Sequence, residues 1–281
     1  MNVTKKVRNN LLLYIVCIIV IIVVLVPLIW VGISSFKSIT DVQKVPIEYI
    51  PRNPTIDTYK FIFFDPRFGN WEKFIINSLK ISIITTLVVT SVASLAGYAF
   101  SRFKFKGASV MLILFLITQM FPGPSILIPI YRLIDKLGLL DTHTAIVLVD
   151  ITLTLPFAIW LAIGSFENIP IDIEEAAYID GCSPIRTFFK VILPISKIGL
   201  VSVAMYTFLL SWSEYVFSLV ILSSETQRTV ALQLGSMASE INVVWNEIGA
   251  ATMVVSLPLL IFFLWAQKYF VKGMVAGAVK E

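Results

Sequence analysis

Long apolar runs, separated by short polar segments, constrain the fold of this chain more than any other feature of its sequence. An α-helix needs about 20 mostly apolar residues to cross the hydrocarbon core of a bilayer, which is about 30 Å thick. Hydrophobic residues make up 57% of the chain and charged residues only 14%, whereas soluble domains carry about 25% charged residues. The sequence therefore predicts an all-α polytopic membrane protein, in which residues 1–281 form one transmembrane domain.

The runs predict six membrane helices, at residues 11–33, 74–100, 108–131, 143–166, 198–222 and 247–265. The third run is interrupted at Pro122-Gly123-Pro124 and again at Pro129. Such breaks are tolerated inside a membrane only where protein or a wet cavity satisfies the freed backbone groups. The proline-containing segment 36–73 is expected to be an ordered external segment with short helices.

The distribution of basic residues predicts which side of the membrane each segment occupies, because short cytoplasmic loops carry an excess of Lys and Arg. The first run is too long for the core of a signal peptide, so we expect it to remain as an uncleaved helix. With the amino terminus inside, the two short outer loops hold only Arg132, Lys136 and Arg228. The inner face then receives Lys5, Lys6, Arg8, Arg102, Lys104, Lys106, Arg186, Lys190, Lys197, Lys268, Lys272 and Lys280. Both termini and residues 170–194 are therefore expected in the cytoplasm.

Residues 170–194, called the elbow below, form a charged segment between two apolar runs. Asp172 and Glu175 have the spacing of a capping box, which would start a short helix. Gly181 can adopt the left-handed backbone conformation that ends such a helix, and Pro194 predicts a later break or kink. A helix, a bend and a second helix fit two situations equally: close contact with another protein, or an amphipathic loop on lipid headgroups.

The residues available for catalysis or metal binding are few. Cys17 and Cys182 form neither a disulfide framework nor a C-x-x-C metal spacing. His143 is the only histidine. The sequence therefore offers no set of histidine ligands for a metal, and one histidine at most for a Ser-His triad. The sequence lacks the G-x-x-x-x-G-K-[ST] motif of ATP-binding loops. We therefore expect no catalytic residue, no metal, no cofactor, no bound ATP and no nucleic-acid partner.

The elbow also carries a long and specific motif. Glu175-Ala176-Ala177 is followed after three residues by Gly181, and after nine more by Val191-Ile192-Leu193-Pro194. This pattern resembles the EAA signature of ATP-binding-cassette import permeases, which reads E-A-A, three residues, G, nine residues, I-x-L-P. Only Val191 departs from it, in place of isoleucine. The resemblance implies the type I importer permease fold, with six transmembrane helices and a cytoplasmic coupling helix.

Further motifs resemble the carbohydrate-uptake branch of that family, and in particular the smaller of the two permeases in maltose-type and oligosaccharide importers. They are Asn77-Ser78, Pro129-Ile130-Tyr131, Leu155-Pro156-Phe157, Trp212 with Glu214-Tyr215, Leu257-Pro258, and the ending Gly273 with Gly277-Ala278-Val279-Lys280. The resemblance covers nearly the whole chain. It implies a bacterial or archaeal cell membrane as the location and a sugar or oligosaccharide as the cargo.

The same resemblance implies a set of partners. A second permease would complete the pore, and an extracytoplasmic solute-binding protein would deliver the sugar to the loop at residues 223–246. A dimer of cytoplasmic ATPases would bind and hydrolyse ATP and receive the elbow in a cleft, with the tail after Lys268 near its interface. The residues that the resemblance assigns to this coupling are Glu174, Glu175, Ala176, Ala177, Asp180, Gly181 and Pro194.

Asp150 is a candidate for contact with the substrate. It lies about 12 Å into the fourth predicted span, and a charge at that depth should face protein or water. It could accept hydrogen bonds from sugar hydroxyls in the pore. Alternatively, it could accept a hydrogen bond that packs helices together, from Thr152, Thr154 or a group of a partner chain.

Trp212, Glu214 and Tyr215 form a second candidate, near the outer end of the fifth predicted span. An aromatic face beside a carboxylate can bind a pyranose ring. The alternative is an aromatic belt at the membrane interface together with a structural carboxylate.

Other functions fit the sequence less well than a sugar importer. A related importer could carry another polar solute, such as glycerol phosphate or a polyol. A secondary transporter or channel acting alone would need a chain of acidic groups inside the membrane, and only Asp150 and Glu214 are available. An intramembrane enzyme would lack a catalytic cluster.

Overall fold

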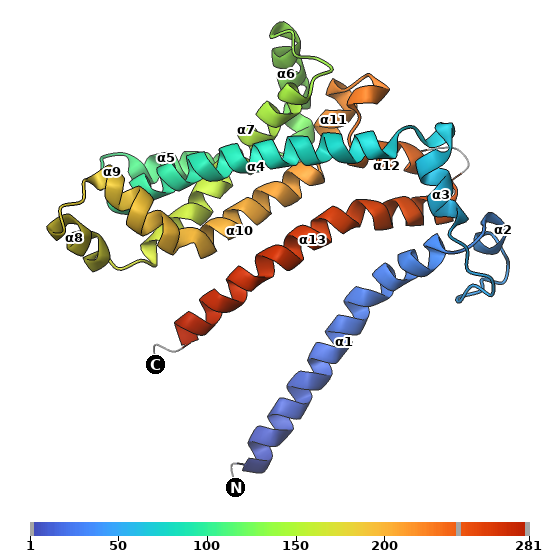
Figure 1. Ribbon diagram of the computed structural model, residues 1–281, viewed down its shortest axis with the longest axis horizontal. Coiled ribbons are helices and arrows are strands. Elements are labelled where there is room, and N and C mark those ends of the chain that lie inside the picture. Colours follow the sequence, from blue (N-terminus) through green and yellow to red (C-terminus); the bar gives the residue numbers. More distant parts are fainter. Residues whose placement is uncertain (1–2, 240–242, 279–281) are drawn as a thin grey trace. The chain divides into compact units, whose positions relative to one another are not determined.

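The computed structural model describes residues 3–239 and 243–278, which form helices and no β-strand (Figure 1). Lys280, Glu281 and residues 240–242 of the expected outer loop lie outside this described part. The α-helices are α1 (Val3–Ser35), α2 (Ile39–Val42), α3 (Asp57–Phe64), α4 (Trp71–Arg102), α5 (Ala108–Thr118), α6 (Gly123–Lys136), α7 (His143–Glu167), α8 (Asp172–Ile179), α9 (Pro184–Thr187), α10 (Leu193–Trp212), α11 (Val216–Ile221), α12 (Val230–Ala238) and α13 (Trp245–Ala278). Short 3-10 helices, η1 (Pro66–Phe68) and η3 (Glu225–Gln227), and a π-helical turn, η2 (Phe188–Ile192), complete the set.

The membrane helices agree with the predicted fold class. In the part of the chain that the structure describes, five helical segments are long and apolar enough to span a bilayer: Leu13–Ser35, Trp71–Arg102, His143–Glu167, Pro184–Trp212 and Trp245–Lys268. The third predicted span consists of α5 and α6, which are bent by 97°. The bend coincides with Pro122, as the sequence predicts, whereas Pro129 lies inside α6 and does not interrupt it.

The fifth predicted span differs most from expectation. It is divided into α10 and α11 by the non-helical residues Ser213 and Glu214. Pro194 does not end the helix, which continues from Pro184 to Trp212. The irregularity that we expected at Pro194 occurs just before it, in the π-helical turn η2.

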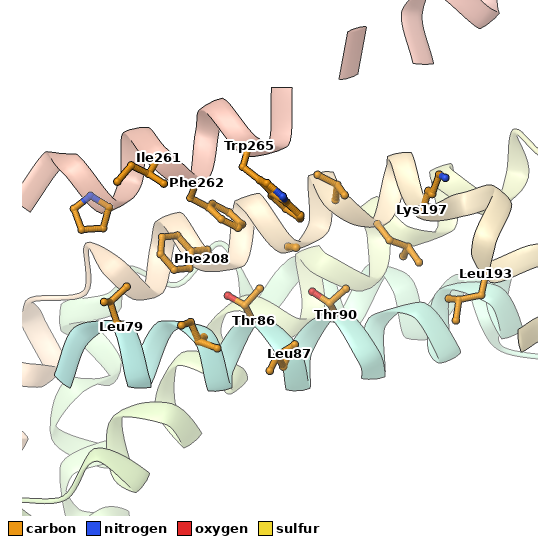
Figure 2. A pocket seen from close by; sticks show the side chains of 15 residues that line it. Leu79, Thr86, Leu87, Thr90, Leu193, Lys197, Phe208, Ile261, Phe262 and Trp265 are labelled. Carbon is orange, nitrogen blue, oxygen red and sulfur yellow. The ribbon is translucent and has the colours of Figure 1, made fainter. Parts of the chain in front are cut away.

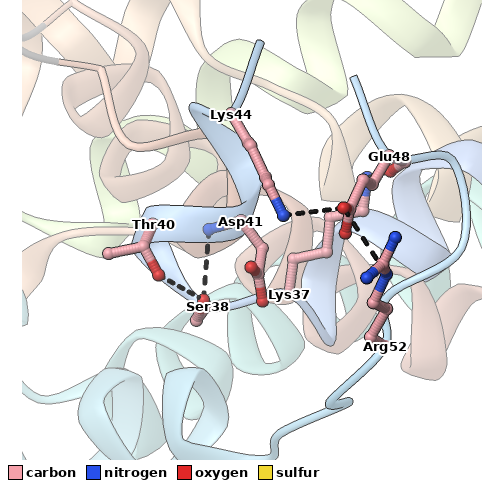
Figure 3. Close-up of polar contacts among 7 residues, drawn as sticks. All are labelled: Lys37, Ser38, Thr40, Asp41, Lys44, Glu48 and Arg52. Carbon is pink, nitrogen blue, oxygen red and sulfur yellow. Dashed lines mark hydrogen bonds and ion pairs between the residues drawn. The ribbon is translucent and has the colours of Figure 1, made fainter. Parts of the chain in front are cut away.

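The described chain divides into two compact units, which we describe separately. The first contains residues 1–71 and 236–256. The segment after α1 is ordered by polar contacts: Ser38 caps α2, and Glu48 accepts a hydrogen bond from Lys44 and pairs with Arg52 (Figure 3). Lys37 is only 1% exposed, and its ammonium group donates a hydrogen bond to the backbone carbonyl of Glu48 at 2.5 Å. The expectation of an ordered segment with short helices is therefore confirmed.

The second unit contains residues 72–235 and 257–281, and its core lies among α4, α7 and α10. In Figure 1, α8 and α9 lie at one end of this bundle, whereas α6 and α11 lie toward the other. Three of the seven core side chains with no exposed surface are alanines, namely Ala93, Ala158 and Ala162; the others are Val89, Phe166, Ile192 and Val203. Small residues allow membrane helices to approach closely, and close packing supplies much of their association energy.

Gly97 of α4 lies very close to Ala162 of α7. A Cβ atom on Gly97 would lie 2.7 Å from the Cβ of Ala162 and 3.0 Å from its carbonyl carbon. Gly199 of α10 packs in the same way against Ser165 of α7. Glycine at these two positions therefore sets the spacing of all three helices.

We predict that Gly97→Ala destabilises the purified protein, because the added methyl group overlaps the α7 backbone; overpacking of this kind costs about 1–3 kcal/mol. Gly164→Ala is the matched control, since a Cβ there meets nothing within 4 Å and alanine favours a helix. Thermal unfolding in detergent should show a lower Tm for the first variant only. Equal Tm values for both variants would contradict the packing described here.

Candidate functional site

The elbow has the predicted order of helix, bend and helix. The chain turns at Gly181, whose φ is 80°, a conformation that side chains other than glycine rarely adopt. After the bend, the side chain of Ser183 accepts a hydrogen bond from the N–H of Arg186 and caps α9. The predicted capping box is wrong, because Ile171 is already helical and Asp172 is the first residue inside α8.

The coupling residues named from the sequence differ in exposure, and those of α8 lie on two different faces of that helix, whereas Pro194 lies in α10. Glu175, Ala176 and Asp180 are exposed, together with Gly181 at the bend. Ala177 is buried, and Glu174 is only 4% exposed. The structure therefore brings most of the motif to one outer surface but turns Glu174 away from it.

Large apolar side chains are exposed around the same surface. Ile179 at the end of α8 is 87% exposed, and Ile185 of α9 is 73% exposed. Ile171 and Phe189 are also more than half exposed. Apolar groups gathered on a polar, solvent-side segment are typical of a surface that contacts another protein or the lipid boundary.

The carboxylate of Glu174 is held by two residues of α4. One oxygen accepts a hydrogen bond from the Nε of Arg102, and the other accepts one from the hydroxyl of Tyr98 at 2.9 Å. Arg102 also donates from Nη2 to the carbonyl of Ile169 at 2.8 Å. The side chains of Arg102 and Glu174 are 9% and 5% exposed, so this is a buried ion pair. Sequence reasoning did not identify it, because no local spacing links residues so far apart in the chain.

An aromatic cluster encloses this ion pair. The Tyr98 ring lies 5.7 Å from the ring of Phe166 in α7 and 4.8 Å from that of Phe188 in η2. Both phenylalanines are nearly fully buried. Apolar walls around a satisfied ion pair exclude water and strengthen its electrostatic attraction.

Asp150 is deeply buried, with 2% of its surface exposed. Its carboxylate accepts a hydrogen bond from the hydroxyl of Ser211 in α10. Thr154 and Thr152, the partners considered from the sequence, donate instead to the backbone carbonyls of Asp150 and Leu148. These contacts favour the helix-packing role for Asp150, although with a different partner.

The residues of the second substrate candidate also make contacts within the chain. Glu214 accepts hydrogen bonds from the N–H groups of Phe217 and Ser218, at 2.6 and 2.9 Å, and so caps α11. Trp212 is 3% exposed and stacks on Phe208, with the ring centroids 5.8 Å apart. Tyr215 is partly exposed. These contacts favour a structural role for the Glu214 carboxylate.

An apolar groove of about 890 Å³ lies among α4, α10 and the part of α13 in the same unit (Figure 2). The only polar side chains in its lining are Thr86, Thr90 and Lys197. A sugar site needs several well-placed hydrogen-bonding groups. This groove is therefore not a candidate sugar site.

At the opposite end of the bundle from the elbow, Asp141 joins two loops. Its carboxylate accepts hydrogen bonds from the N–H groups of Ser223 and Ser224, each at 2.9 Å, and from the Ser224 hydroxyl. The Ser224 hydroxyl, followed by these N–H groups, lowers the pKa of Asp141 below its usual range. Asp141 has a φ of 58°, which aspartate tolerates better than most residues. Sequence reasoning missed this link, which orders the start of the expected outer loop.

Among the described residues, no group of three His, Cys, Asp or Glu side chains is placed to hold a metal ion. Cys17 and Cys182 are both free thiols. A broken membrane span, a motif-bearing elbow and several apolar spans define the chain as a membrane permease.

Residues 90–276 match the family model described as "Binding-protein-dependent transport system inner membrane component". The chain is 34% identical over 278 residues to the trehalose/maltose transport system permease protein MalG of Thermococcus litoralis, covering 98% of this chain and 99% of the relative. It is 34% identical over 255 residues to the galactooligosaccharides transport system permease protein GanQ of Bacillus subtilis, covering 90% and 89%. The chain therefore belongs to the family of binding-protein-dependent transport system inner membrane components.

The fold agrees with that assignment. A crystal structure of a bacterial ABC transporter involved in the import of the acidic polysaccharide alginate matches with a TM-score of 0.76 and 22% identity. The match covers 96% of this chain and 99% of that one. The likeness confirms the six-span importer permease fold that the sequence predicts.

We predict that the contact between Asp150 and Ser211 stabilises the packing of α7 on α10. Asp150→Ala and Ser211→Ala should each lower the free energy of unfolding, and the double variant should cost less than their sum. Hydrogen bonds between membrane helices are worth about 0.6–2 kcal/mol, which sets the expected coupling. Denaturant or thermal unfolding in detergent of the unaltered protein, the two single variants and the double variant measures this coupling energy. Strictly additive losses of stability would contradict an interaction between Asp150 and Ser211.

Proposed function

We propose that the chain is the permease subunit of an ATP-driven importer for a sugar or oligosaccharide. The relatives named for trehalose/maltose and galactooligosaccharide transport support this cargo class, as does the fold shared with a permease from an alginate importer. The observation that carries the proposal is the elbow: an EAA motif with its glycine at a φ of 80° and its exposed face rich in isoleucine.

The exposed face of the elbow is the proposed docking surface for a cytoplasmic ATPase. Glu175 and Asp180 supply negative charge there, and Ala176 allows a close approach. Ile179 and Ile185 supply apolar area that has no partner within the described chain. Basic residues concentrated on the elbow side of the membrane support a cytoplasmic location for this surface and for both termini.

A second permease subunit is proposed to complete the pore. The bend between α5 and α6 leaves helix ends at membrane depth, and its residues Met120 and Phe121 are 80% and 59% exposed. Irregular backbone of this kind is stable in a membrane only against protein or beside water. A partner subunit and an aqueous pathway together would supply both environments.

The outer end is proposed to receive a solute-binding protein. Asp141 orders residues Ser223 and Ser224, and Asn77 donates to the carbonyls of Thr226 and Arg228 at 3.0 and 2.9 Å. The first part of the loop is thus presented in a fixed shape. A related alginate transporter structure, with a TM-score of 0.65, was determined with its pentasaccharide-bound periplasmic protein.

Direct contact with the sugar by Asp150, Trp212, Glu214 or Tyr215 remains a proposal. Glu214 and Tyr215 are partly exposed, whereas Asp150 and Trp212 are almost completely buried. Uptake of labelled oligosaccharides by Asp150→Asn, compared with the unaltered protein, tests the first of them. Unchanged rate and selectivity would remove Asp150 from the pore lining.

The runner-up cargo is another polar solute, such as a polyol or glycerol derivative. A sulfoquinovosyl glycerol transport system permease protein, SmoH of Agrobacterium fabrum, is 30% identical over 256 residues, covering 91% of this chain and 89% of the relative. Uptake assays with labelled oligosaccharides and labelled glycerol phosphate, in membranes that contain all partner subunits, separate the two cargo classes.

We predict that Glu175→Lys greatly reduces co-purification of the ATPase and abolishes ATP-driven sugar uptake. The side chain is exposed, so the fold should persist, while the reversed charge opposes docking. Glu167→Lys, an exposed change at the end of α7, is the matched control and should leave co-purification unaltered. Full ATPase binding and uptake with Glu175→Lys would refute the docking surface and favour a loop that lies on lipid headgroups.

A further inference from the structure

We propose that Glu174 is a positioning residue, which locks the coupling helix α8 to the end of α4 so that the two move as one body during transport. This inference rests on the proposed function. It assigns different roles to two neighbouring acidic residues of the motif: Glu174 fixes α8 to α4, and Glu175 contacts the ATPase.

The first observation is that these neighbouring carboxylates point in different directions. Glu175 is exposed on the docking surface, whereas Glu174 is 4% exposed and faces α4. Successive residues on a helix are about 100° apart, so one can touch a partner while the next packs inward. Glu174 therefore cannot contact an ATPase while the elbow keeps this conformation.

The second observation is that both oxygens of Glu174 are engaged by α4. Arg102 and Tyr98 lie four residues apart and thus on one face of that helix. Arg102 uses a second nitrogen to hold the carbonyl of Ile169, just before α8 begins. Hydrogen bonds at separate points resist rotation of α8 against α4 as well as separation of the two helices. The planar guanidinium of Arg102 is well suited to making such bonds in two directions.

The third observation is that few apolar side chains of α8 pack on the bundle. It contains eight residues, and its buried members are Glu174 and Ala177, while Ile173 is partly buried against the core. One buried methyl group and one partly buried isoleucine contribute limited apolar stabilisation. The ion pair is therefore the charged link that holds α8 on α4, in addition to the covalent path from α8 through Gly181 to α10.

Beyond α4, the packing can carry the displacement further. Gly97 fixes α4 against Ala162 of α7, and Gly199 fixes α10 against Ser165. Closely packed elements transmit displacement because their interiors compress little. The path from the docking surface to α10 is thus continuous within this unit.

The test uses the whole transporter, with its partner permease, ATPase and binding protein, in proteoliposomes supplied with a mixture of labelled malto- and galacto-oligosaccharides. Glu174→Gln keeps the shape of the side chain but removes its charge. ATPase assembly should stay near that of the unaltered protein. The number of ATP molecules hydrolysed per sugar imported should rise about 2- to 30-fold, the range expected for a weakened coupling. A purely structural role would reduce the amount of assembled transporter and leave this ratio unchanged.

Tyr98→Phe provides a milder second variant, because it removes one hydrogen bond and retains the ion pair and the ring. It should raise the ratio in the same direction by a smaller factor, and it decides the question if Glu174→Gln does not assemble. Glu167→Gln, which alters an exposed carboxylate of α7, is the control and should match the unaltered protein.

The outcomes separate this inference from the function on which it rests. An unchanged ratio in Glu174→Gln, or in Tyr98→Phe where only that variant assembles, overturns the positioning role and leaves the importer intact. If the unaltered transporter shows no ATP-driven uptake of either oligosaccharide class, the proposed function fails and this inference fails with it.

Discussion

The buried carboxylate of Glu174 is the constraint on which the elbow depends. A charge removed from water is tolerated only when a counter-charge and hydrogen bonds replace its hydration, and breaking one partner of such a pair typically costs about 3–5 kcal/mol. Arg102 and Tyr98 meet that requirement from one face of α4. A short helix with almost no apolar core is thereby fixed to the bundle, which leaves its other face free to bind a partner.

The membrane bundle follows a complementary principle, in which close packing replaces hydrophobic driving force. Lipid tails are as apolar as leucine, so membrane helices associate through contact between small residues and a few interhelical hydrogen bonds. Gly97 and Gly199 provide the close contacts, and Asp150 with Ser211 provides the hydrogen bond between α7 and α10.

The fold was largely predictable from the sequence, because the length of an apolar run and the bend at Gly181 depend on local chemistry. Pro194 was expected to mark a break or kink, whereas the helix continues through it and the irregularity is the π-helical turn just before it. Glu174 was grouped with Glu175 because a motif does not reveal which face of a helix is buried. Ser211 was not identified as the partner of Asp150, because a contact between residues 61 positions apart arises only from tertiary packing.

In the proposed mechanism, force from an ATPase enters the bundle through a rigid joint between α8 and α4. Spin labels at Asp172→Cys and Leu95→Cys, both exposed positions, report the separation of these helices in the assembled transporter once Cys17 and Cys182 are replaced by serine. We predict the same distance distribution in the nucleotide-free and ATP-bound states. A distance that shifts or broadens on ATP binding, while sugar uptake remains coupled to hydrolysis, would contradict the claim.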